Sequence, residues 1–117
     1  MSAVVTMYGI RNCDTVKKAR AWLAAHQIEH AFHDFKSAGI DRAHLERWCR
    51  VHGWETVLNR AGTTFRKLPD AEKQNLSEPA AIRVMLEHPS AIKRPVLEAG
   101  PRSVVGFTPE HYTELFG

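Results

Sequence analysis

The chain has 117 residues, of which 44% are hydrophobic and 25% are charged, and its formal net charge is +3 at pH 7. At about 150 residues per domain, this length and composition indicate one globular domain and exclude a disordered, collagen-like or disulfide-framework protein. The longest apolar run, residues 21–25, is far shorter than the roughly 20 residues of a membrane span. No basic region precedes the short apolar stretch at the N-terminus, so we expect neither a membrane protein nor a signal peptide.

The cysteine content indicates the cellular compartment of the protein, and the charge distribution indicates which kinds of binding partner to expect. Two cysteines, Cys13 and Cys49, favour the reducing cytoplasm, because a secreted domain of this size more often carries a set of disulfides. The chain has no CxxC motif, which argues against a redox dithiol and against paired zinc ligands. The longest runs of basic residues are only two residues long, so we do not expect a nucleic-acid partner.

The first third of the chain predicts a βαβ unit. Residues 3–8 are apolar and rich in β-branched residues, as in a buried strand, and residues 14–25 carry a helical apolar stripe. Residues 29–35 predict a second strand, whose mixed polar residues suit an edge position. Two strands joined by a helix are normally parallel, with a right-handed crossover.

The middle of the chain predicts helices. Asp41 can cap a helix that ends at Gly53, and Asp70 can cap a short one. Ser77 opens a further helix that stops before Pro89. The residues expected on the apolar faces of the first and last of these helices are Leu45, Trp48, Cys49, His52, Ile82, Met85 and Leu86.

The end of the chain predicts a ββα unit. Residues 96–99 and 103–105 form a β-hairpin around Gly100 and Pro101. Thr108 and Pro109 begin a final helix. That helix is expected to bury Tyr112, Leu115 and Phe116. The predicted order is therefore βαβ, helices, ββα, which makes the chain an α/β protein.

Cys13 is the main candidate for chemistry. It follows a strand and a loop that contains Gly9, and it directly precedes a helix, whose free N–H groups and dipole stabilise a thiolate. Cysteines in this position can have a pKa lowered from about 8.5 to roughly 3.5–7.5. Arg11 lies close in sequence and would add to the effect. The alternative interpretation is a small residue at the start of a helix that takes part in no reaction.

Other candidate groups have simpler interpretations. Cys49 falls on the apolar stripe of a helix, where a buried and inert thiol is expected. The seven histidines are scattered without a completing set of Cys or carboxylate ligands, so we expect no metal site. Four arginines lie in loops or at the ends of elements, and these are Arg60, Arg66, Arg94 and Arg102. Arginines gathered near Cys13 would bind a carboxylate or oxyanion; otherwise each is a solvated charge.

A reactive Cys13 is compatible with only some reactions. Tyrosine phosphatases need an arginine six residues after the cysteine, but Ala19 follows Cys13 at that spacing and Glu55 follows Cys49. Papain-like hydrolases need a histidine base and a longer chain. Thiol–disulfide exchange needs only an exposed thiolate and a site that holds the partner thiol. This chain can supply both.

Three segments carry a family resemblance. Residues 8–19 read Tyr-Gly-Ile-Arg-Asn-Cys-Asp-Thr-Val-Lys-Lys-Ala, residues 58–68 read Leu-Asn-Arg-Ala-Gly-Thr-Thr-Phe-Arg-Lys-Leu, and residues 92–96 read Ile-Lys-Arg-Pro-Val. Together they resemble the ArsC/Spx family, and within it the YffB-like branch. The resemblance implies a thioredoxin-like fold in which one domain, residues 1–117, holds a helical insertion at about residues 41–91.

The resemblance also implies roles for particular residues. Cys13 matches the reactive cysteine of the family, and Arg60 and Arg94 match arginines that arsenate reductases place near the anion. Pro95 matches the cis-proline that faces the active cysteine in thioredoxin-like folds.

Two departures from the family are visible. Arsenate reductases have a third arginine after the Arg-Pro strand, where this chain reads Gly-Phe-Thr-Pro at residues 106–109, and Arg102 comes earlier. Spx-type regulators usually carry a CxxC switch, and the residues from Cys13 to Val16 lack its second cysteine.

We therefore expect a glutathione-dependent thiol reductase in which Cys13 forms a mixed disulfide. Glutathione would be a co-substrate rather than a bound cofactor, and a second glutathione or a glutaredoxin would resolve the mixed disulfide. The residues expected to bind substrate or glutathione are Arg11, Asn12, Arg60, Arg66, Arg94 and Pro95. The alternatives are an Spx-like regulator that binds a protein such as RNA polymerase, and an arsenate reductase linked to glutathione and glutaredoxin. We expect a monomer.

Overall fold

The computed structural model describes residues 4–116, so Ala3 of the first predicted strand lies outside the described residues. The chain divides into two compact units. The first contains the described residues up to Phe35 and from Arg94 onward, and the second contains Lys36–Lys93. The range 41–91, predicted as an insertion, falls inside the second unit.

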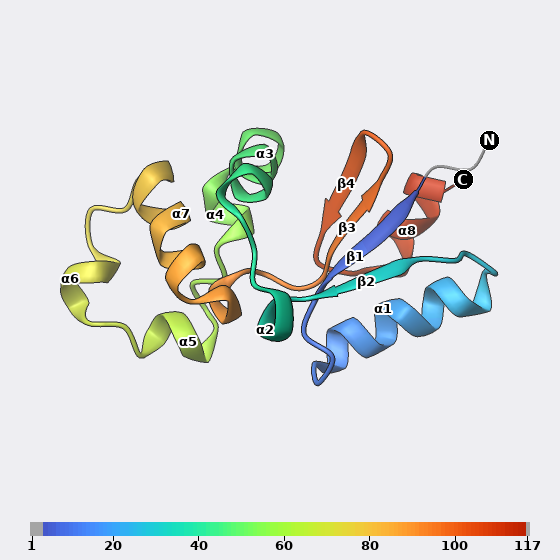
Figure 1. Cartoon of the computed structure of the whole chain (residues 1–117), viewed down its shortest axis with the longest axis horizontal. Coiled ribbons are helices and arrows are strands. Elements are labelled where there is room, and N and C mark those ends of the chain that lie inside the picture. Colours follow the sequence, from blue (N-terminus) through green and yellow to red (C-terminus); the bar gives the residue numbers. More distant parts are fainter. Residues whose placement is uncertain (1–3, 117) are drawn as a thin grey trace. The chain divides into compact units, whose positions relative to one another are not determined.

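The first unit is built on a four-stranded sheet in the order β2-β1-β3-β4 (Figure 1). Its strands are β1 (Val5–Gly9), β2 (Ala31–Asp34), β3 (Val96–Ala99) and β4 (Arg102–Val105). Strand β1 pairs parallel to β2 and antiparallel to β3, and β3 pairs antiparallel to β4. This confirms the parallel βαβ unit, the edge position of its second strand and the hairpin near the C-terminus.

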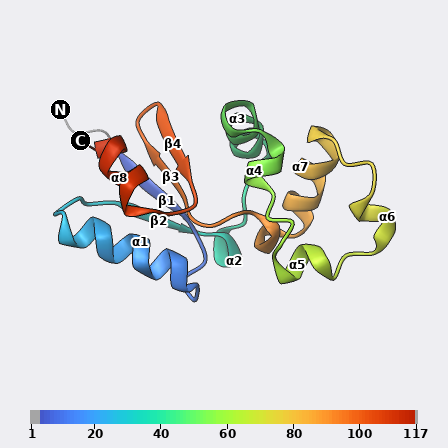
Figure 2. The ribbon, with the colours of Figure 1, turned by 180° about the vertical axis from the view of Figure 1, so that it is seen from behind.

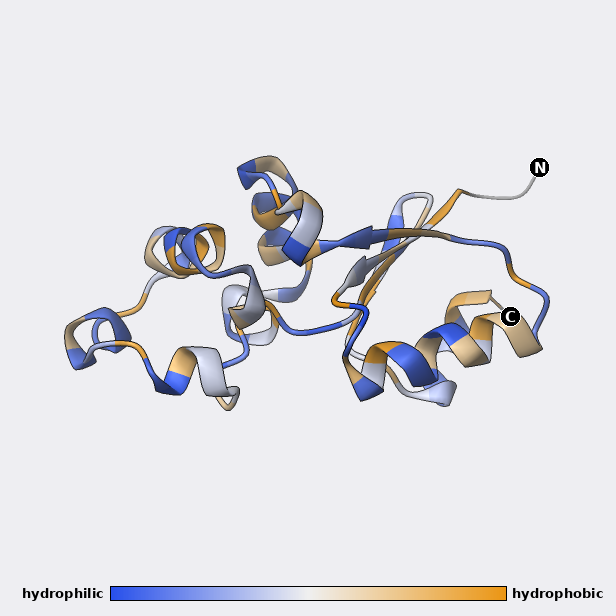
Figure 3. Ribbon diagram, turned by 60° about the horizontal axis from the view of Figure 1, so that its bottom comes forward, coloured by the Kyte–Doolittle hydropathy of each residue, from blue (hydrophilic) through white to orange (hydrophobic). Residues whose placement is uncertain are grey.

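Two helices, α1 (Asp14–Ala25) and α8 (Pro109–Phe116), lie on the same side of the sheet (Figures 2 and 3). Hydrophilic and hydrophobic residues alternate along α1 in Figure 3, as expected for a helix with one buried face. The buried residues packed together between these helices and the sheet are Val5, Met7, Val16, Ala19, Leu23, Leu97, Ala99, Tyr112 and Leu115. Burying one large apolar side chain of this kind contributes about 1.5–3 kcal/mol.

The second predicted strand is shorter than expected. We predicted residues 29–35, but β2 pairs with β1 only from Ala31 to Asp34. Phe35 instead begins a short helix, α2 (Phe35–Ala38), and its ring is buried. The prediction of the longer strand was wrong because an edge strand has a single partner, and it ends where that partner ends, at Gly9.

The second unit is helical. Its elements are α3 (Arg42–His52), α4 (Trp54–Val57), α5 (Thr63–Arg66), α6 (Asp70–Lys73), α7 (Glu78–Glu87) and a 3₁₀ turn (Pro89–Ala91). Asp41 accepts a hydrogen bond from His44 N at 2.9 Å, and the Ser77 side chain caps α7, as predicted. None of the helices within residues 4–116 combines the length and the apolar character needed to cross a bilayer.

Some local predictions in the helical regions were wrong. Pro69 rather than Asp70 is the N-cap of α6. Leu86 and Phe116 are half-buried rather than buried. The helices α4 and α5 were not predicted, because each has four residues and is too short to show a helical period.

Residues 57–59, in the middle of the second unit, run beside residues 91–93 at its C-terminal end. Leu58 and Ile92 form an isolated antiparallel bridge. The Lys93 N–H donates to the Val57 carbonyl and the Asn59 N–H donates to the Ala91 carbonyl, each at 2.8 Å. These bonds fix the residues that lead directly into Arg94.

Two buried tyrosines of the first unit give a matched test of this core. The Tyr112 hydroxyl is buried and has no hydrogen-bond partner among the described residues, whereas Tyr8 Oη donates to Glu98 Oε1 at 2.9 Å. Burying an unsatisfied hydroxyl costs about 1–3 kcal/mol, while a typical hydrogen bond contributes about 0.5–1.5 kcal/mol. We expect Tyr112→Phe to leave the free energy of unfolding unchanged or to raise it, and Tyr8→Phe to lower it by about 1 kcal/mol. Urea unfolding followed by circular dichroism measures both, and a larger loss in Tyr112→Phe would contradict the assignment.

Candidate functional site

Cys13 stands at the junction between β1 and α1. The strand ends at Gly9, residues 11–12 form a turn, and Cys13 is the N-cap of α1 with extended backbone (φ −134°, ψ 124°). Its carbonyl accepts the first helical hydrogen bond, from Lys17 N at 2.9 Å. The side chain is half-buried, so the sulfur meets the first turn of the helix and still has access to solvent.

Gly9 allows the strand and the helix to approach each other. A Cβ atom built on Gly9 would lie 2.9 Å from Val16 Cγ2, which is closer than real side chains pack. Val16 is a β-branched residue with no solvent exposure, so it has little freedom to move aside. A glycine at the end of β1 is therefore what permits the first turn of α1, and with it Cys13, to sit against the end of the strand.

The surroundings of Cys13 favour its thiolate. Burial by itself raises the pKa of the thiol, but the N–H groups of Val16 and Thr15 and the guanidinium of Arg94 act against it, and the net result is a pKa below the ordinary value. No helix N–H of the described residues forms a capping hydrogen bond of ordinary geometry to this side chain. The helix N–H groups therefore act mainly as nearby positive dipoles.

Arg94 and Pro95 reach the same end of the sheet from the other half of the chain. They directly precede β3, whose first residue, Val96, pairs with Tyr8 of β1. The Arg94–Pro95 peptide bond is cis, and the Pro95 carbonyl accepts a hydrogen bond from Gly106 N at 2.8 Å. The antiparallel pairing thus places the half-buried Arg94 beside the residues that follow β1, where it interacts with Cys13.

Arg11 and Asn12 are exposed residues of the turn before Cys13. The Arg11 side chain folds back onto β2, with Nε 3.4 Å from Asp34 Oδ2 and the guanidinium carbon 5.4 Å from the centroid of the Phe32 ring. The structure thus gives Arg11 contacts within the protein. That Arg11 and Asn12 bind a ligand stays a prediction.

The other predicted arginines belong elsewhere in the chain. Arg60 and Arg66 are exposed residues of the second unit, and the Arg60 guanidinium carbon lies 5.4 Å from the centroid of Trp54. Their assignment to ligand binding stays a prediction.

Arg102 lies at the opposite end of the sheet from Arg94. It pairs with Ala99, the last residue of β3, which in turn pairs with Val5 at the start of β1. Its guanidinium donates to the Leu115 carbonyl at 3.2 Å, near the C-terminus of α8. Arg102 therefore hydrogen-bonds the C-terminal end of α8 and does not lie near Cys13.

Cys49 has the opposite character to Cys13. It is buried in α3, as the sequence predicted, and burial raises the pKa of its thiol to about 11, with further contributions from Glu78 and Glu55. A thiol with this pKa is almost entirely protonated at neutral pH and is a poor nucleophile.

Sequence reasoning missed the contacts that Phe32, Asp34 and Arg20 make around the Cys13 turn. The Arg20 guanidinium carbon lies 4.5 Å from the Phe32 centroid, and its Nε donates to His30 Nε2 at 3.2 Å. The position of Asp34 could have been predicted from the sequence, because it lies at the end of the second strand of the predicted βαβ unit. Parallel strands joined by a helix end at the same edge of a sheet, so the end of β2 had to lie beside the end of β1.

Comparison of the chain with known proteins identifies the family to which it belongs. The ArsC family model matches residues 8–115. A solved structure of a YFFB protein is 58% identical, with a TM-score of 0.95 over 97% of this chain and 100% of that one. The structure of an arsenate reductase (ArsC) related protein from Brucella melitensis is 50% identical, with a TM-score of 0.77 over 99% of this chain and 97% of that one.

A more distant relative is named as a transcriptional regulator. The global transcriptional regulator Spx of Streptococcus pyogenes is 27% identical over 106 residues, which is 89% of this chain and 78% of Spx.

The likeness to the solved structures covers the whole βαβ, helical and ββα order. It confirms the predicted thioredoxin-like fold with its helical insertion.

The pH dependence of Cys13 alkylation tests the electrostatics of the site. Because the pKa of this thiol is lowered, the rate with iodoacetamide should rise through a midpoint below that of an ordinary exposed thiol. Arg94→Gln should move the midpoint upward, since the thiolate loses a neighbouring positive charge. Arg102→Gln makes the same change of charge at the far end of the sheet and should leave the midpoint in place. Mass spectrometry identifies the labelled cysteine, and equal shifts in the two variants would contradict the role of Arg94.

Proposed function

Since the chain belongs to the ArsC family, we propose that it is a glutathione-dependent thiol–disulfide oxidoreductase with Cys13 as its nucleophile. One observation carries the proposal. Cys13 is half-exposed at the start of α1, and the first turn of the helix and Arg94 together lower the pKa of its thiol despite partial burial. Thiol–disulfide exchange is the reaction that needs these features and little else.

The proposed reaction has two exchange steps. The Cys13 thiolate attacks the glutathione sulfur of a substrate disulfide R–S–S–G; a new S–S bond forms, the old one breaks, and RS⁻ leaves and is protonated to the reduced product. A second glutathione thiolate then attacks the glutathione sulfur of the Cys13 mixed disulfide. Oxidised glutathione leaves and the Cys13 thiolate is restored. The sum is R–S–S–G + GSH → RSH + GSSG.

Each residue near the sulfur has a part in these steps. The N–H groups of Thr15 and Val16 stabilise the thiolate as attacking group in the first step and as leaving group in the second. Arg94 adds its charge to that stabilisation, and a guanidinium beside the sulfur suits the carboxylates of glutathione. The backbone at Pro95 would align the cysteine of the incoming glutathione, while Arg60 and Arg66 remain the proposed additional partners of its carboxylates.

An external thiol is expected to resolve the mixed disulfide. The chain has only one other cysteine, and Cys49 is a buried thiol whose pKa is raised to about 11. Glutathione itself or a glutaredoxin would supply the second thiol, in a reducing compartment such as the cytoplasm.

Similarity to Spx favours a second candidate function, a regulatory protein that binds a partner such as RNA polymerase. This candidate requires no turnover at Cys13. It predicts that the chain captures a purified polymerase subunit equally well with Cys13 or Ser at position 13.

Arsenate reduction is the weakest of the three candidates. It calls for a third arginine at the anion, and Arg102 is bonded to Leu115 at the opposite end of the sheet. A coupled assay with arsenate, glutathione and glutaredoxin tests it directly.

The test of the main proposal is the glutathione adduct. After incubation with oxidised glutathione, mass spectrometry should find one glutathione on Cys13 in the natural chain. The adduct should disappear in Cys13→Ser and persist in Cys49→Ser, the matched control. Turnover of a small glutathione mixed disulfide in the presence of glutathione should follow the same pattern.

Two results would count against the proposal. An adduct on Cys49 in the Cys13→Ser variant would contradict the assignment of the nucleophile. An ordinary pH midpoint for Cys13 with no adduct, together with capture of the polymerase subunit, would favour the regulatory candidate instead.

A further inference from the structure

We propose that Asp34 and Phe32 are positioning residues that act on Cys13 through Arg11, an inference that rests on the proposed role of Cys13 as nucleophile. The sequence predicted Arg11 as a residue that binds substrate or glutathione. The structure gives its side chain two contacts on the edge strand, an ion pair with Asp34 and a cation–π contact with the Phe32 ring.

The first contact ties the Cys13 turn to the end of β2. Arg11 Nε lies 3.4 Å from Asp34 Oδ2, and the two side chains differ sharply in exposure, 70% for Arg11 and 13% for Asp34. Asp34 is held in the sheet opposite Gly9, the last residue of β1. The carboxylate is therefore the fixed partner, and the turn that carries Arg11 is the part whose position it can set.

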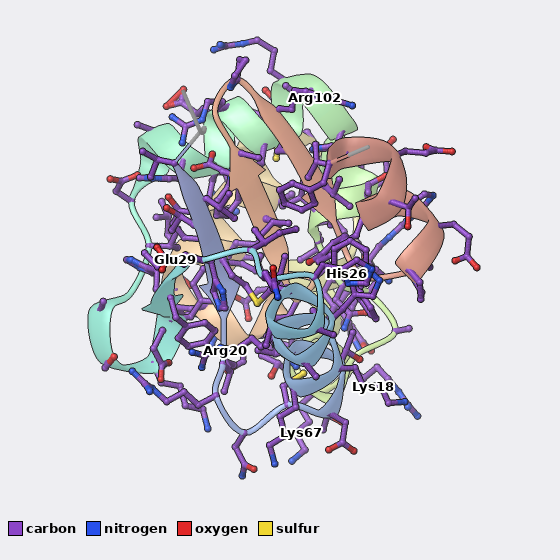
Figure 4. The ribbon with its side chains drawn as sticks, turned by 90° about the vertical axis from the view of Figure 1, so that its right-hand side faces the viewer. Lys18, Arg20, His26, Glu29, Lys67 and Arg102 are labelled. Atoms are coloured by element: carbon purple, nitrogen blue, oxygen red, sulfur yellow. The ribbon has the colours of Figure 1, made fainter. Side chains whose placement is uncertain are left out.

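The second contact involves the ring of Phe32. The guanidinium carbons of Arg11 and Arg20 lie 5.4 and 4.5 Å from its centroid. In Figure 4, Lys18 and Arg20 leave α1 on opposite sides. Arg11 precedes Cys13 and Arg20 follows it within α1, so one aromatic ring contacts a residue on each side of the nucleophile in the sequence. Each such contact contributes about 0.5–1 kcal/mol at an exposed site.

The position of Cys13 matters because the groups that stabilise its thiolate act only at short distance and in particular orientations. The Cys13 sulfur must stay aligned with the N–H groups of Thr15 and Val16 and within reach of Arg94. Displacement of a reacting group by about 1 Å can cost as much as a hundredfold in rate. A looser turn before Cys13 would therefore slow its reactions even if the fold were intact.

The two roles for Arg11 predict opposite effects of Asp34. If Arg11 binds an anionic ligand, Asp34 competes for the guanidinium, and its removal should speed reaction with anionic reagents. If Arg11 positions Cys13, Asp34 supports that role, and its removal should slow every reagent. Loss of a negative charge would by itself stabilise the thiolate, so slower reaction after Asp34→Asn reports position rather than charge.

The experiment compares a neutral and an anionic alkylating reagent, iodoacetamide and iodoacetate, on the full chain. We expect Arg11→Gln, Asp34→Asn and the double variant to slow Cys13 alkylation by both reagents to the same extent, about three- to tenfold. The double variant should be no slower than Arg11→Gln alone, because removal of the guanidinium already abolishes the contacts with both Asp34 and Phe32. The pH midpoint of Cys13 should move upward in all three. Phe32→Leu should have a smaller effect in the same direction.

Controls separate position from damage to the fold. Asp34→Glu keeps the carboxylate and should recover part of the lost rate. Lys18→Gln makes the same change of charge as Arg11→Gln on the other side of α1 and should react like the natural chain. Labelling of the buried Cys49 should stay as low as in the natural chain, since a general loss of structure would expose it.

Two outcomes would overturn the inference. One is an Asp34→Asn variant that reacts as fast as, or faster than, the natural chain with iodoacetamide. The other is a slowing of Arg11→Gln confined to iodoacetate, which would make Arg11 an anion-binding residue. Neither outcome requires glutathione, so failure of this inference is distinguishable from failure of the proposed function, which shows as absence of the glutathione adduct.

Discussion

The arrangement of this site depends on the close approach of the end of β1 to the first turn of α1. Gly9 lies against Val16 without a side chain between them, and this contact brings the sulfur of Cys13 to the free N–H groups at the start of the helix. Burial alone would raise the pKa of the thiol and make it unreactive. The helix N-terminus and the Arg94 guanidinium reverse that effect, so a partly buried cysteine becomes more acidic than an exposed one.

The pairing of the central strand brings the remaining groups to the same place. β1 has β2 on one side and β3 on the other, so the residues at its C-terminal end have neighbours from two distant parts of the chain. Asp34 comes from β2, where the parallel strand ends beside Gly9. Arg94 comes from the segment before β3, where the antiparallel strand begins beside Tyr8. The same pairing carries Arg102 to the far end of the sheet, where it bonds to the end of α8.

Charge around Cys13 is divided between two functions. Arg94 acts directly on the sulfur, whereas Arg11, which is closer in sequence, is paired with Asp34 and lies over the Phe32 ring. Such a division lets one guanidinium stabilise the thiolate while another holds the turn that carries it. The contrast between Cys13 and Cys49 has the same physical origin. Both thiols are partly or wholly removed from water, but only Cys13 has positive groups directed at it, while Cys49 has the carboxylates of Glu78 and Glu55 nearby.

The sequence by itself determined the elements that depend on local patterns. The βαβ and ββα order, the helix from Asp41 to Gly53, the place of Cys13 before a helix and the burial of Cys49 all follow from periodicity, capping residues and glycines, which act over a few residues. Helices of a single turn, such as α4 and α5, leave no such pattern and were missed. Only the tertiary structure showed how an arginine from a distant segment meets the nucleophile. Local pattern does not distinguish Arg94 from Arg102, and the sequence singled out Arg94 only through the family resemblance. Strand pairing brings one to Cys13 and the other to the opposite end of the sheet, because register is set by contacts between residues far apart in the chain.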